Sequence, residues 1–417
     1  MLTQHNCIIG QSGGPTVAIN ASLSGVLKGI LNSDQYDTAF GMVNGIEGLL
    51  QNKFLNLSER FPTQESLDQL AITPSMYLGS CRFKLPHYDV APEVYEILFN
   101  FFEQHNIKSV FYIGGNDSMD TVLKLSSYAK LHAIDVNIIG IPKTVDNDLP
   151  MTDHTPGFGS AAKFVATTLL EIAHDTYIYN IPSITIVEIM GRNAGWLTAA
   201  SALARTYYSP APDLIYLPEV PFSMEQFVAD VRDVQKTRKN IIIAISEGIK
   251  DLEGNYISAT STAVDAFGHK QLCGAGKTLE NHLKAELGCK VRSIELNVLQ
   301  RSAAHIASKT DIDESISIGK YAVTLATAGV TAEMACYKRT SDHPYTIELS
   351  SHAIDSIANK EKTVPLDWVN ERGNNLTDDV ITYLQPLIEG ETVMGFYKGL
   401  PAYCDISHLH TKGYFKK

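Results

Sequence analysis

This chain contains five short apolar runs, and each is followed directly by glycine or polar residues. The runs are Asn6–Gly10, Ser109–Ile113, Val136–Ile141, Ser183–Ile189 and Ile241–Ser246. Runs of this length, separated by amphipathic stretches, predict parallel strands that are buried on both faces. We therefore expect an α/β fold made of two Rossmann-like lobes with mainly parallel sheets.

The spacing of the runs indicates where the lobes divide. We expect one α/β lobe over residues 1–160, completed by part of 300–345, and a second over 161–300. Residues 340–417 are expected to form a C-terminal helical or docking extension, with a helix at the start of 350–369. Because ligands bind outside the carboxyl ends of parallel strands, we expect the site in the cleft between the lobes.

Charge and cysteine usage limit the class of protein. The formal net charge of −12 disfavours binding to nucleic acid and to anionic membranes. No apolar run approaches the roughly 20 residues of a membrane helix, and the N-terminus lacks the pattern of a signal peptide. The six cysteines are scattered without CxxC spacing, which is typical of reduced thiols. We expect a cytoplasmic protein that must gather positive charge locally if its substrate is an anion.

Two glycine pairs follow predicted strands. Gly13 and Gly14 lie between a strand and a helix, where backbone N–H groups can approach a phosphate at the helix N-terminus. A tight turn without a ligand explains this pair equally well. Gly115 precedes Asn116 and Asp117, whose oxygens suit Mg²⁺, although either residue could simply cap the helix.

The loop after the third run combines a lysine with two carboxylates, Lys143, Asp146 and Asp148. A carboxylate can take a proton from an attacking sugar hydroxyl while a lysine and a metal neutralise the transferring phosphoryl group. A loop of this composition could instead be a solvated polar turn, but its position directly after an apolar strand disfavours that interpretation.

Further charged residues accompany these clusters. Arg192 follows the fourth run, where its guanidinium can bind a phosphate in bidentate fashion, and a loop presents a second arginine, Arg82. Glu247, after the fifth run, can accept hydrogen bonds from sugar hydroxyls, and Arg292 and Arg301 add charge further along. On an acidic chain, arginines next to strand ends favour an anion site over an ordinary surface role.

Taken together, these motifs resemble the phosphofructokinase family over most of the first 330 residues. The sequence reads SGG, LGS-x-RF, GGNDS, PKTVDND, VEIMGR and SEG in the order of the family, followed by Arg292 and the pair QR. No single motif is specific, but the combination is. The resemblance implies the phosphofructokinase fold and the reversible phosphorylation of D-fructose 6-phosphate to fructose 1,6-bisphosphate in glycolysis and gluconeogenesis, with Mg²⁺ as cofactor.

The resemblance also implies a role for each matching residue. Asp146 matches the general base, and Thr144 and Arg192 match further catalytic positions. Contacts to the phosphoryl donor fall on Gly13, Gly14 and Arg82, and metal contacts on Asn116 and Asp148. Contacts to the sugar phosphate fall on Thr144, Val145, Asp146, Met190, Gly191, Arg192, Glu247, Arg292, Val298 and Arg301. Because the arginine at Arg292 usually comes from a neighbouring subunit in this family, the resemblance implies a homodimer or homotetramer with shared sites.

Two residues point to pyrophosphate as the donor. Members of the family that use ATP typically carry glycine at the position of Asp117, and many also at that of Lys143, whereas members that use pyrophosphate resemble this chain at both. An Asp117 carboxylate would repel the α-phosphate of a nucleotide by about 4 kcal/mol at a separation of about 4 Å. Pyrophosphate has no α-phosphate, and Lys143 can bind it directly.

Three departures from the family pattern leave the substrate partly open. Asn116 replaces an aspartate that often binds metal, Val298 a histidine near the sugar phosphate, and Ser183 an arginine at the subunit interface. A longer sugar phosphate such as sedoheptulose 7-phosphate is therefore conceivable as a substrate.

Three competing hypotheses about the function also stay open. The chain could be an ATP-dependent 6-phosphofructokinase, which Asp117 and Lys143 together disfavour. It could be a catalytically silent regulatory subunit of the family, which the presence of Asp146, Arg192 and Glu247 disfavours. It could be an unrelated nucleotide-binding module, which the missing dinucleotide and Walker motifs disfavour.

Overall fold

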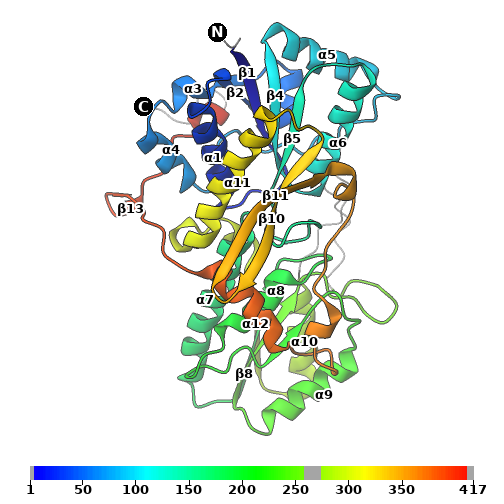
Figure 1. Ribbon diagram of the computed structural model, residues 1–417. Coiled ribbons are helices and arrows are strands. Elements are labelled where there is room, and N and C mark those ends of the chain that lie inside the picture. The colour runs from blue at the N-terminus through cyan, green and yellow to red at the C-terminus, as the bar shows by residue number, and fades with distance from the viewer. Residues whose placement is uncertain (1–3, 258–273, 411–417) are drawn as a thin grey trace.

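The computed structural model describes residues 4–257 and 274–410, which form two lobes stacked one above the other (Figure 1). Both ends of the drawn chain lie at the upper lobe (Figure 1). Of the helices within the described residues, none has both the length and the apolar character needed to cross a membrane.

The upper lobe is built on a seven-stranded sheet in the order β11-β10-β5-β4-β1-β2-β3. The strands are β1 (His5–Gln11), β2 (Tyr36–Met42), β3 (Phe54–Asn56), β4 (Ile107–Gly114), β5 (Asn137–Pro142), β10 (Glu333–Asp342) and β11 (Tyr345–Ala353). The run from β10 to β2 is parallel, and the edge strands β11 and β3 are antiparallel to their neighbours. The parallel strands therefore end at one edge of the sheet.

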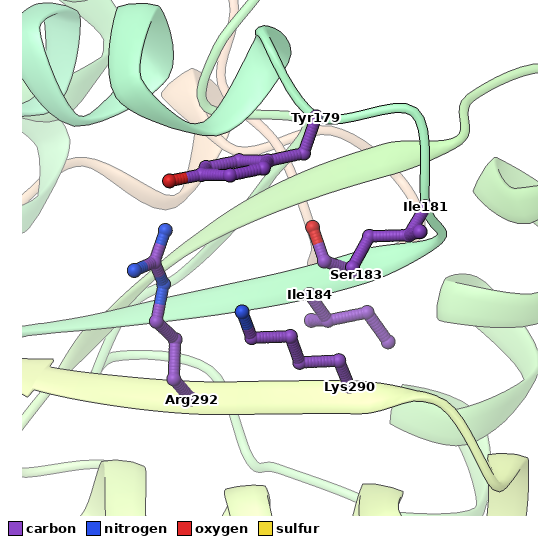
Figure 2. A pocket seen from close by; sticks show the side chains of 6 residues that line it. All are labelled: Tyr179, Ile181, Ser183, Ile184, Lys290 and Arg292. Carbon is purple, nitrogen blue, oxygen red and sulfur yellow. The ribbon is translucent and has the colours of Figure 1, made fainter.

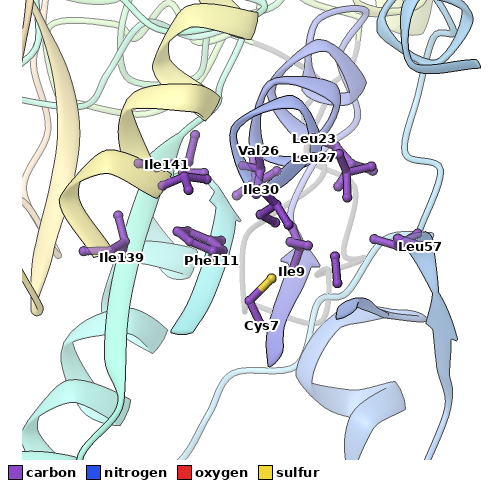
Figure 3. Packing of buried hydrophobic residues seen from close by; sticks show 14 of the residues in the cluster. Cys7, Ile9, Leu23, Val26, Leu27, Ile30, Leu57, Phe111, Ile139 and Ile141 are labelled. Carbon is purple, nitrogen blue, oxygen red and sulfur yellow. The ribbon is translucent and has the colours of Figure 1, made fainter. Parts of the chain in front are cut away.

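Side chains of the central strands alternate between two cores, as a sheet covered on both faces requires. Ile9 and Phe111 pack with α1 (Ile19–Leu31) and α11 (Lys309–Thr327) on one face, as Figure 3 shows for part of this cluster. Ile8 and Val110 pack in the opposite core. The other helices of this lobe are α2 (Gly45–Leu50), α3 (Leu57–Arg60), α4 (Gln64–Ala71), α5 (Pro92–Gln104) and α6 (Asn116–Leu131).

The lower lobe contains a parallel four-stranded sheet in the order β7-β8-β6-β9. Its strands are β6 (Ser183–Ile189), β7 (Leu214–Tyr216), β8 (Asn240–Ser246) and β9 (Lys290–Glu295). One core includes residues of α7 (Phe158–Tyr177), α8 (Trp196–Ala200) and α12 (Asp378–Leu384), and the other includes residues of α9 (Met224–Gln235) and α10 (Ala275–Leu287). A small hairpin, β12 (Phe396–Tyr397) and β13 (Leu400–Pro401), extends from the side of the molecule (Figure 1).

Short 3-10 helices complete the chain, namely Ser201–Ala204, Asn297–Arg301, Ala304–Ile306, Ile354–Ser356, Leu366–Trp368, Gln385–Ile388 and Ser407–Leu409. The predicted α/β fold with mainly parallel sheets is confirmed, and all five apolar runs are strands. The prediction of a helix at the start of 350–369 is wrong, because Ser350–Ala353 pair with β10 and only a 3-10 turn follows. We keep the division into lobes near residues 160 and 300 as a proposal, with β10 and β11 added to the first.

A buried ionic cluster lies where the chain passes between the lobes. The His154 ring contacts Asp153 through Nδ1 (2.9 Å) and Glu314 through Nε2 (2.6 Å), and it stacks on Tyr337. Arg339 pairs with the same Asp153 carboxylate at 3.0 Å. Burial alone would lower the pKa of His154, but the two carboxylates outweigh it and raise that pKa to about 9. The imidazolium therefore joins α11 and β10 to the segment after β5.

We expect His154→Gln to lower the free energy of unfolding most strongly at acidic and neutral pH. The folded pKa of about 9 exceeds the unfolded value of 6.5, so the contribution is complete below pH 6.5 and is lost as pH rises towards 9. Its full size is about 3 kcal/mol, since one pKa unit corresponds to about 1.4 kcal/mol. Urea unfolding from pH 6 to 10 measures the difference, with the exposed His305→Gln as control. A difference from wild type that is constant with pH would contradict the assignment.

Candidate active site

A cavity of about 660 Å³ lies between the lobes, at the carboxyl ends of the parallel strands. All five polar clusters that follow the apolar runs contribute to its walls. The predicted site residues that line it are Gly13, Gly14, Arg82, Asn116, Asp117, Lys143, Thr144, Val145, Asp146, Asp148, Met190, Arg192, Glu247 and Arg301. One concave site therefore holds the glycine turns, the carboxylates and most of the predicted cations.

Glycine and lysine shape the end of the cavity next to the upper sheet. Gly13 has a φ of +81°, a conformation that favours glycine, and a Cβ there would lie 3.2 Å from the Lys143 Nζ. Lys143 donates a hydrogen bond to the Gly14 carbonyl at 2.7 Å. The Gly13 N–H donates to the Cys81 carbonyl, so it is already used within the protein. Helix α6 begins at Asn116 on the same wall and directs its positive end at the cavity, which favours a phosphate there.

The Lys143 ammonium is buried in this wall. Burial lowers its pKa to about 8, although Asp146 and Asp148 act in the opposite direction. An anion bound at this end would raise that pKa again, because an opposite charge stabilises the ammonium form. The site is therefore electrostatically suited to an anionic ligand.

The loop after β5 presents its carboxylates in the middle of the cavity. The Asp146 N–H donates to Thr144 Oγ1 (3.1 Å), and Asn147 has a φ of +54°, which turns the chain back between the two acids. Burial raises the pKa of Asp146, and the nearby charge of Glu247 adds to this effect while Lys143 opposes it. An acid with a raised pKa in a cleft is typical of a general base.

Residues of the lower lobe form the opposite wall. The Gly191 N–H donates to Glu247 Oε1 and the Met190 N–H to Gln300 Oε1, each at 3.4 Å. The first bond holds the turn after β6 against the end of β8, and the second holds it against the 3-10 helix Asn297–Arg301. Burial raises the pKa of Glu247 to about 7. Gly191 itself supports this wall from behind, since it is absent from the lining.

Two buried polar atoms in the cavity walls have no hydrogen-bond partner, Arg192 Nε and Asp148 Oδ1. Buried polar atoms are normally paired, so an unpaired guanidinium nitrogen and an unpaired carboxylate oxygen in one cavity point to missing ligands. An anion suits Arg192, and a hard cation suits Asp148. Mg²⁺ is usually held by one or two carboxylates together with substrate phosphates, and Asp148 fits that donor set. Within residues 4–257 and 274–410, no group of three or more His, Cys, Asp and Glu residues could hold a metal without a substrate.

Two predicted residues lie away from the cavity. Arg292 is on β9, where its guanidinium contacts Thr185, Asp175 and Thr176. Figure 2 shows it in a small pocket with Lys290 and Tyr179, which has no lining residue in common with the cavity. Val298 is half exposed in the turn before Arg301. Within a single chain, neither side chain reaches the site.

The lining residues to which sequence reasoning gave no role include Lys84, Asn193, Asn359 and Glu361. Lys84 and Asn193 lie close to Arg82 and Arg192, in or beside loops that the sequence had already marked, so a place in the site could have been predicted for them. Asn359 and Glu361 follow the 3-10 helix Ile354–Ser356, and no motif of the sequence marks them.

Comparison with known proteins places the chain in a family. The phosphofructokinase family model matches residues 6–326. A pyrophosphate–fructose 6-phosphate 1-phosphotransferase of Halomonas elongata is 39% identical over 403 residues, which cover 96% of each chain. The enzyme of the same name from Methylococcus capsulatus is 37% identical over 98% of this chain and 97% of its own. A solved structure, the pyrophosphate-dependent phosphofructokinase of Nitrosospira multiformis, has a TM-score of 0.87 at 34% identity and covers 96% of both chains.

The family's motifs thus surround one cavity between two α/β lobes, and relatives match along nearly the whole length. This chain belongs to the phosphofructokinase family.

Proposed function

We propose that the protein transfers a phosphoryl group from pyrophosphate to the 1-hydroxyl of D-fructose 6-phosphate, giving fructose 1,6-bisphosphate and phosphate. The observation that supports this most directly is the position of Asp146. Its carboxylate lies in one cavity with Lys143 and Asp117 on the upper wall and with Glu247 and Arg301 on the lower wall. The full-length relatives named for this reaction support the same assignment.

The reaction is an in-line transfer in which Asp146 accepts the proton. The sugar O1 forms a bond to the nearer phosphorus of pyrophosphate, and the bond from that phosphorus to the bridging oxygen breaks. The hydroxyl proton passes to Asp146, and the bridging oxygen leaves with orthophosphate. In the reverse direction the protonated Asp146 returns its proton to O1.

Cations of the cavity stabilise the charge on the transferring group. Lys143 and Arg82 serve the donor, while Arg192 faces the reacting phosphoryl group with its unpaired Nε. When bound, Mg²⁺ neutralises charge on the phosphoryl oxygens. Asp148 would hold it, because Asp148 Oδ1 is buried and unpaired. Asn116, predicted for the same role, lines the same cavity, but both polar atoms of its amide already bond to the backbone of Asn359 and Lys360.

The lower wall binds the sugar phosphate. Glu247 accepts hydrogen bonds from sugar hydroxyls, Arg301 binds the 6-phosphate, and Met190 packs against the sugar, with Gly191 behind it and Thr144 and Val145 as further contacts. Val298 replaces a histidine that the family resemblance places near the sugar phosphate, so sedoheptulose 7-phosphate stays a second acceptor to be assayed.

The competing hypotheses have less support. An ATP-dependent enzyme has to accommodate the α-phosphate next to Asp117, which lies in the cavity wall. A silent regulatory subunit has no use for a complete catalytic set, and Asp146, Arg192 and Glu247 all line the same cavity.

Arg292 supports a shared site between two copies of the chain. Its side chain is 40% exposed, and exposed apolar residues lie on the adjoining turn and loop, namely Ile178, Tyr179, Ile181, Tyr207 and Tyr208. An apolar patch of this kind is typical of a subunit interface. A second copy covering this patch would receive Arg292 in its sugar-phosphate site, in a homodimer or a homotetramer.

We assign the protein to the cytoplasm, where its free thiols at Cys7, Cys81 and Cys336 stay reduced.

We expect Asp146→Ser to lower kcat by at least about 10²–10⁴-fold, the usual effect of losing a general base. Binding of pyrophosphate should be retained, since Lys143 and the glycine turn stay in place. Steady-state kinetics and circular dichroism of the purified variant test this. Near-normal turnover in a folded variant would remove Asp146 from the mechanism.

Donor choice is expected to depend on Asp117 and Lys143 together. Wild type should use pyrophosphate and be nearly inactive with ATP, and Asp117→Gly should raise kcat/KM for ATP at least about tenfold by relieving the repulsion. Lys143→Gly should mainly damage the use of pyrophosphate. The double variant should shift the preference further than either single change, because neighbouring sites couple. The test is kcat/KM for both donors in all four proteins, and a wild type that prefers ATP would refute the donor assignment.

Mixing two inactive variants tests the shared site. In a hybrid of Arg292→Ala and Asp146→Ser, one of the two sites regains both wild-type residues. Random exchange of subunits in a dimer therefore restores about a quarter of the wild-type activity. Subunit exchange is verified by native mass spectrometry. A mixture that exchanges subunits and stays inactive would show that Arg292 does not act across an interface.

A further inference from the structure

A short segment after β11, residues 359–362, crosses the cavity wall, and we call it the clasp. Its upper end is tied to α6. Asn116 accepts a hydrogen bond from the Asn359 N–H (2.6 Å) and donates one to the Lys360 carbonyl (2.5 Å). The Asn359 side chain donates to Asp120 Oδ1 at 3.0 Å. The amide of Asn116 is thus engaged by the clasp on both of its polar atoms.

The lower end of the clasp is tied to the other lobe and to the catalytic loop. Asn193 donates to both oxygens of Glu361 at 3.2 and 3.3 Å, and the Trp196 indole donates to the Lys362 carbonyl. The Lys362 N–H donates to the Asp148 carbonyl at 2.7 Å. The Lys362 ammonium donates to two further carbonyls of the segment after β5. The clasp is therefore fixed at both ends.

Asn359 and Glu361 both line the cavity. Because Asn116 and Asn193 hold its two ends, the clasp spans the wall from the start of α6 to the turn after β6. The clasp lies outside residues 6–326, the part of the chain that the family model matches.

We propose that the clasp limits the length of the phosphoryl donor, with Asn359 and Glu361 as specificity-determining residues that exclude donors longer than two phosphoryl groups. This inference rests on the proposed use of pyrophosphate. The proposed effect of the clasp is separate from that of Asp117, which lies on α6 and repels a third phosphate or an α-phosphate from there.

Two physical effects lead to this exclusion. A donor that extends beyond pyrophosphate must leave the end formed by Gly13, Lys143 and the start of α6, where the clasp is bonded to Asn116. The Glu361 carboxylate, exposed at the cavity wall, then repels the additional phosphoryl charge, because two like charges a few ångströms apart repel each other even where water screens them. The clasp also cannot move aside without breaking its bonds to both lobes, so the wall resists a longer ligand.

Inorganic tripolyphosphate is the appropriate probe, since it adds one phosphoryl group and no nucleoside. Glu361→Gln removes the charge but can still accept the bond from Asn193. Asn359→Gly removes the side chain and suits the φ of +61° at this position. Glu371→Gln, an exposed acid of the same C-terminal region, is the matched control. Asp117 stays unchanged in all of these proteins.

We expect Glu361→Gln to raise the ratio of kcat/KM for tripolyphosphate to that for pyrophosphate by about tenfold, the effect of removing one like charge near the ligand. Asn359→Gly should raise the same ratio, and Glu371→Gln should leave it unchanged. Unchanged ratios in both clasp variants would overturn the proposal. An equal fall of both values would also overturn it, because the clasp would then only support the fold.

Calorimetric titration of each protein with the two polyphosphates keeps this inference distinct from the proposed function. A wild type that shows no turnover with pyrophosphate would refute the proposed function. The ratio of the two dissociation constants would still test the role of the clasp. We expect Glu361→Gln to bind tripolyphosphate more tightly relative to pyrophosphate than wild type does, and an unchanged ratio would contradict the proposal.

Discussion

Helices α1 and α11 touch backbone to backbone, and the arrangement of the site depends on that contact. A Cβ on Gly25 would lie 2.2 Å from the Ile316 carbonyl oxygen, and one on Gly319 would lie 2.3 Å from that of Ser22. Only glycine at both positions allows the helices to approach so closely. The contact brings the chain back to the upper lobe after it has formed the lower sheet, and β10 then pairs with β5. The clasp follows from the strand beside β10, so its place over the cavity is set by helix packing on the far side of the sheet.

This acidic chain gathers opposite charges in one partly buried cavity. Lys143, Arg192 and Arg301 share the cavity with Asp146, Asp148 and Glu247, whose pKa values are all raised by burial. Buried charges are costly unless they are paired, and the unpaired atoms of Arg192 and Asp148 show that the pairing is incomplete in the protein alone. The anionic substrates proposed above would complete it, which reconciles a net charge of −12 with a site for anions.

The sequence was most informative where local pattern and tertiary structure coincide. Strands such as Ser183–Ile189 are buried on both faces, so continuous apolar character identified them, and strand polarity placed the residues after them at one cleft. The same reasoning failed for Ser350–Ala353, an edge strand that is only partly buried. It also missed Asn359 and Glu361, whose positions depend on contacts with residues 243 and 168 positions away. Arg292 matched a family motif, yet it lies away from the cavity of its own chain, so a role for it requires a second copy of the chain. The only trace of such a copy in a single sequence is the residues that stay exposed when the chain folds alone.

The order of strands along the chain also bears on how the protein is made. The four strands of the lower sheet are complete at Glu295, whereas the upper sheet, which begins at His5, lacks β10 and β11 until Ala353 has been added. Chains emerge from the ribosome N-terminus first, so the lobe that starts earlier acquires its last strands later. During synthesis the edge of β5 stays open while the whole lower sheet is made, and that open edge is a site where pairing with other chains has to be avoided.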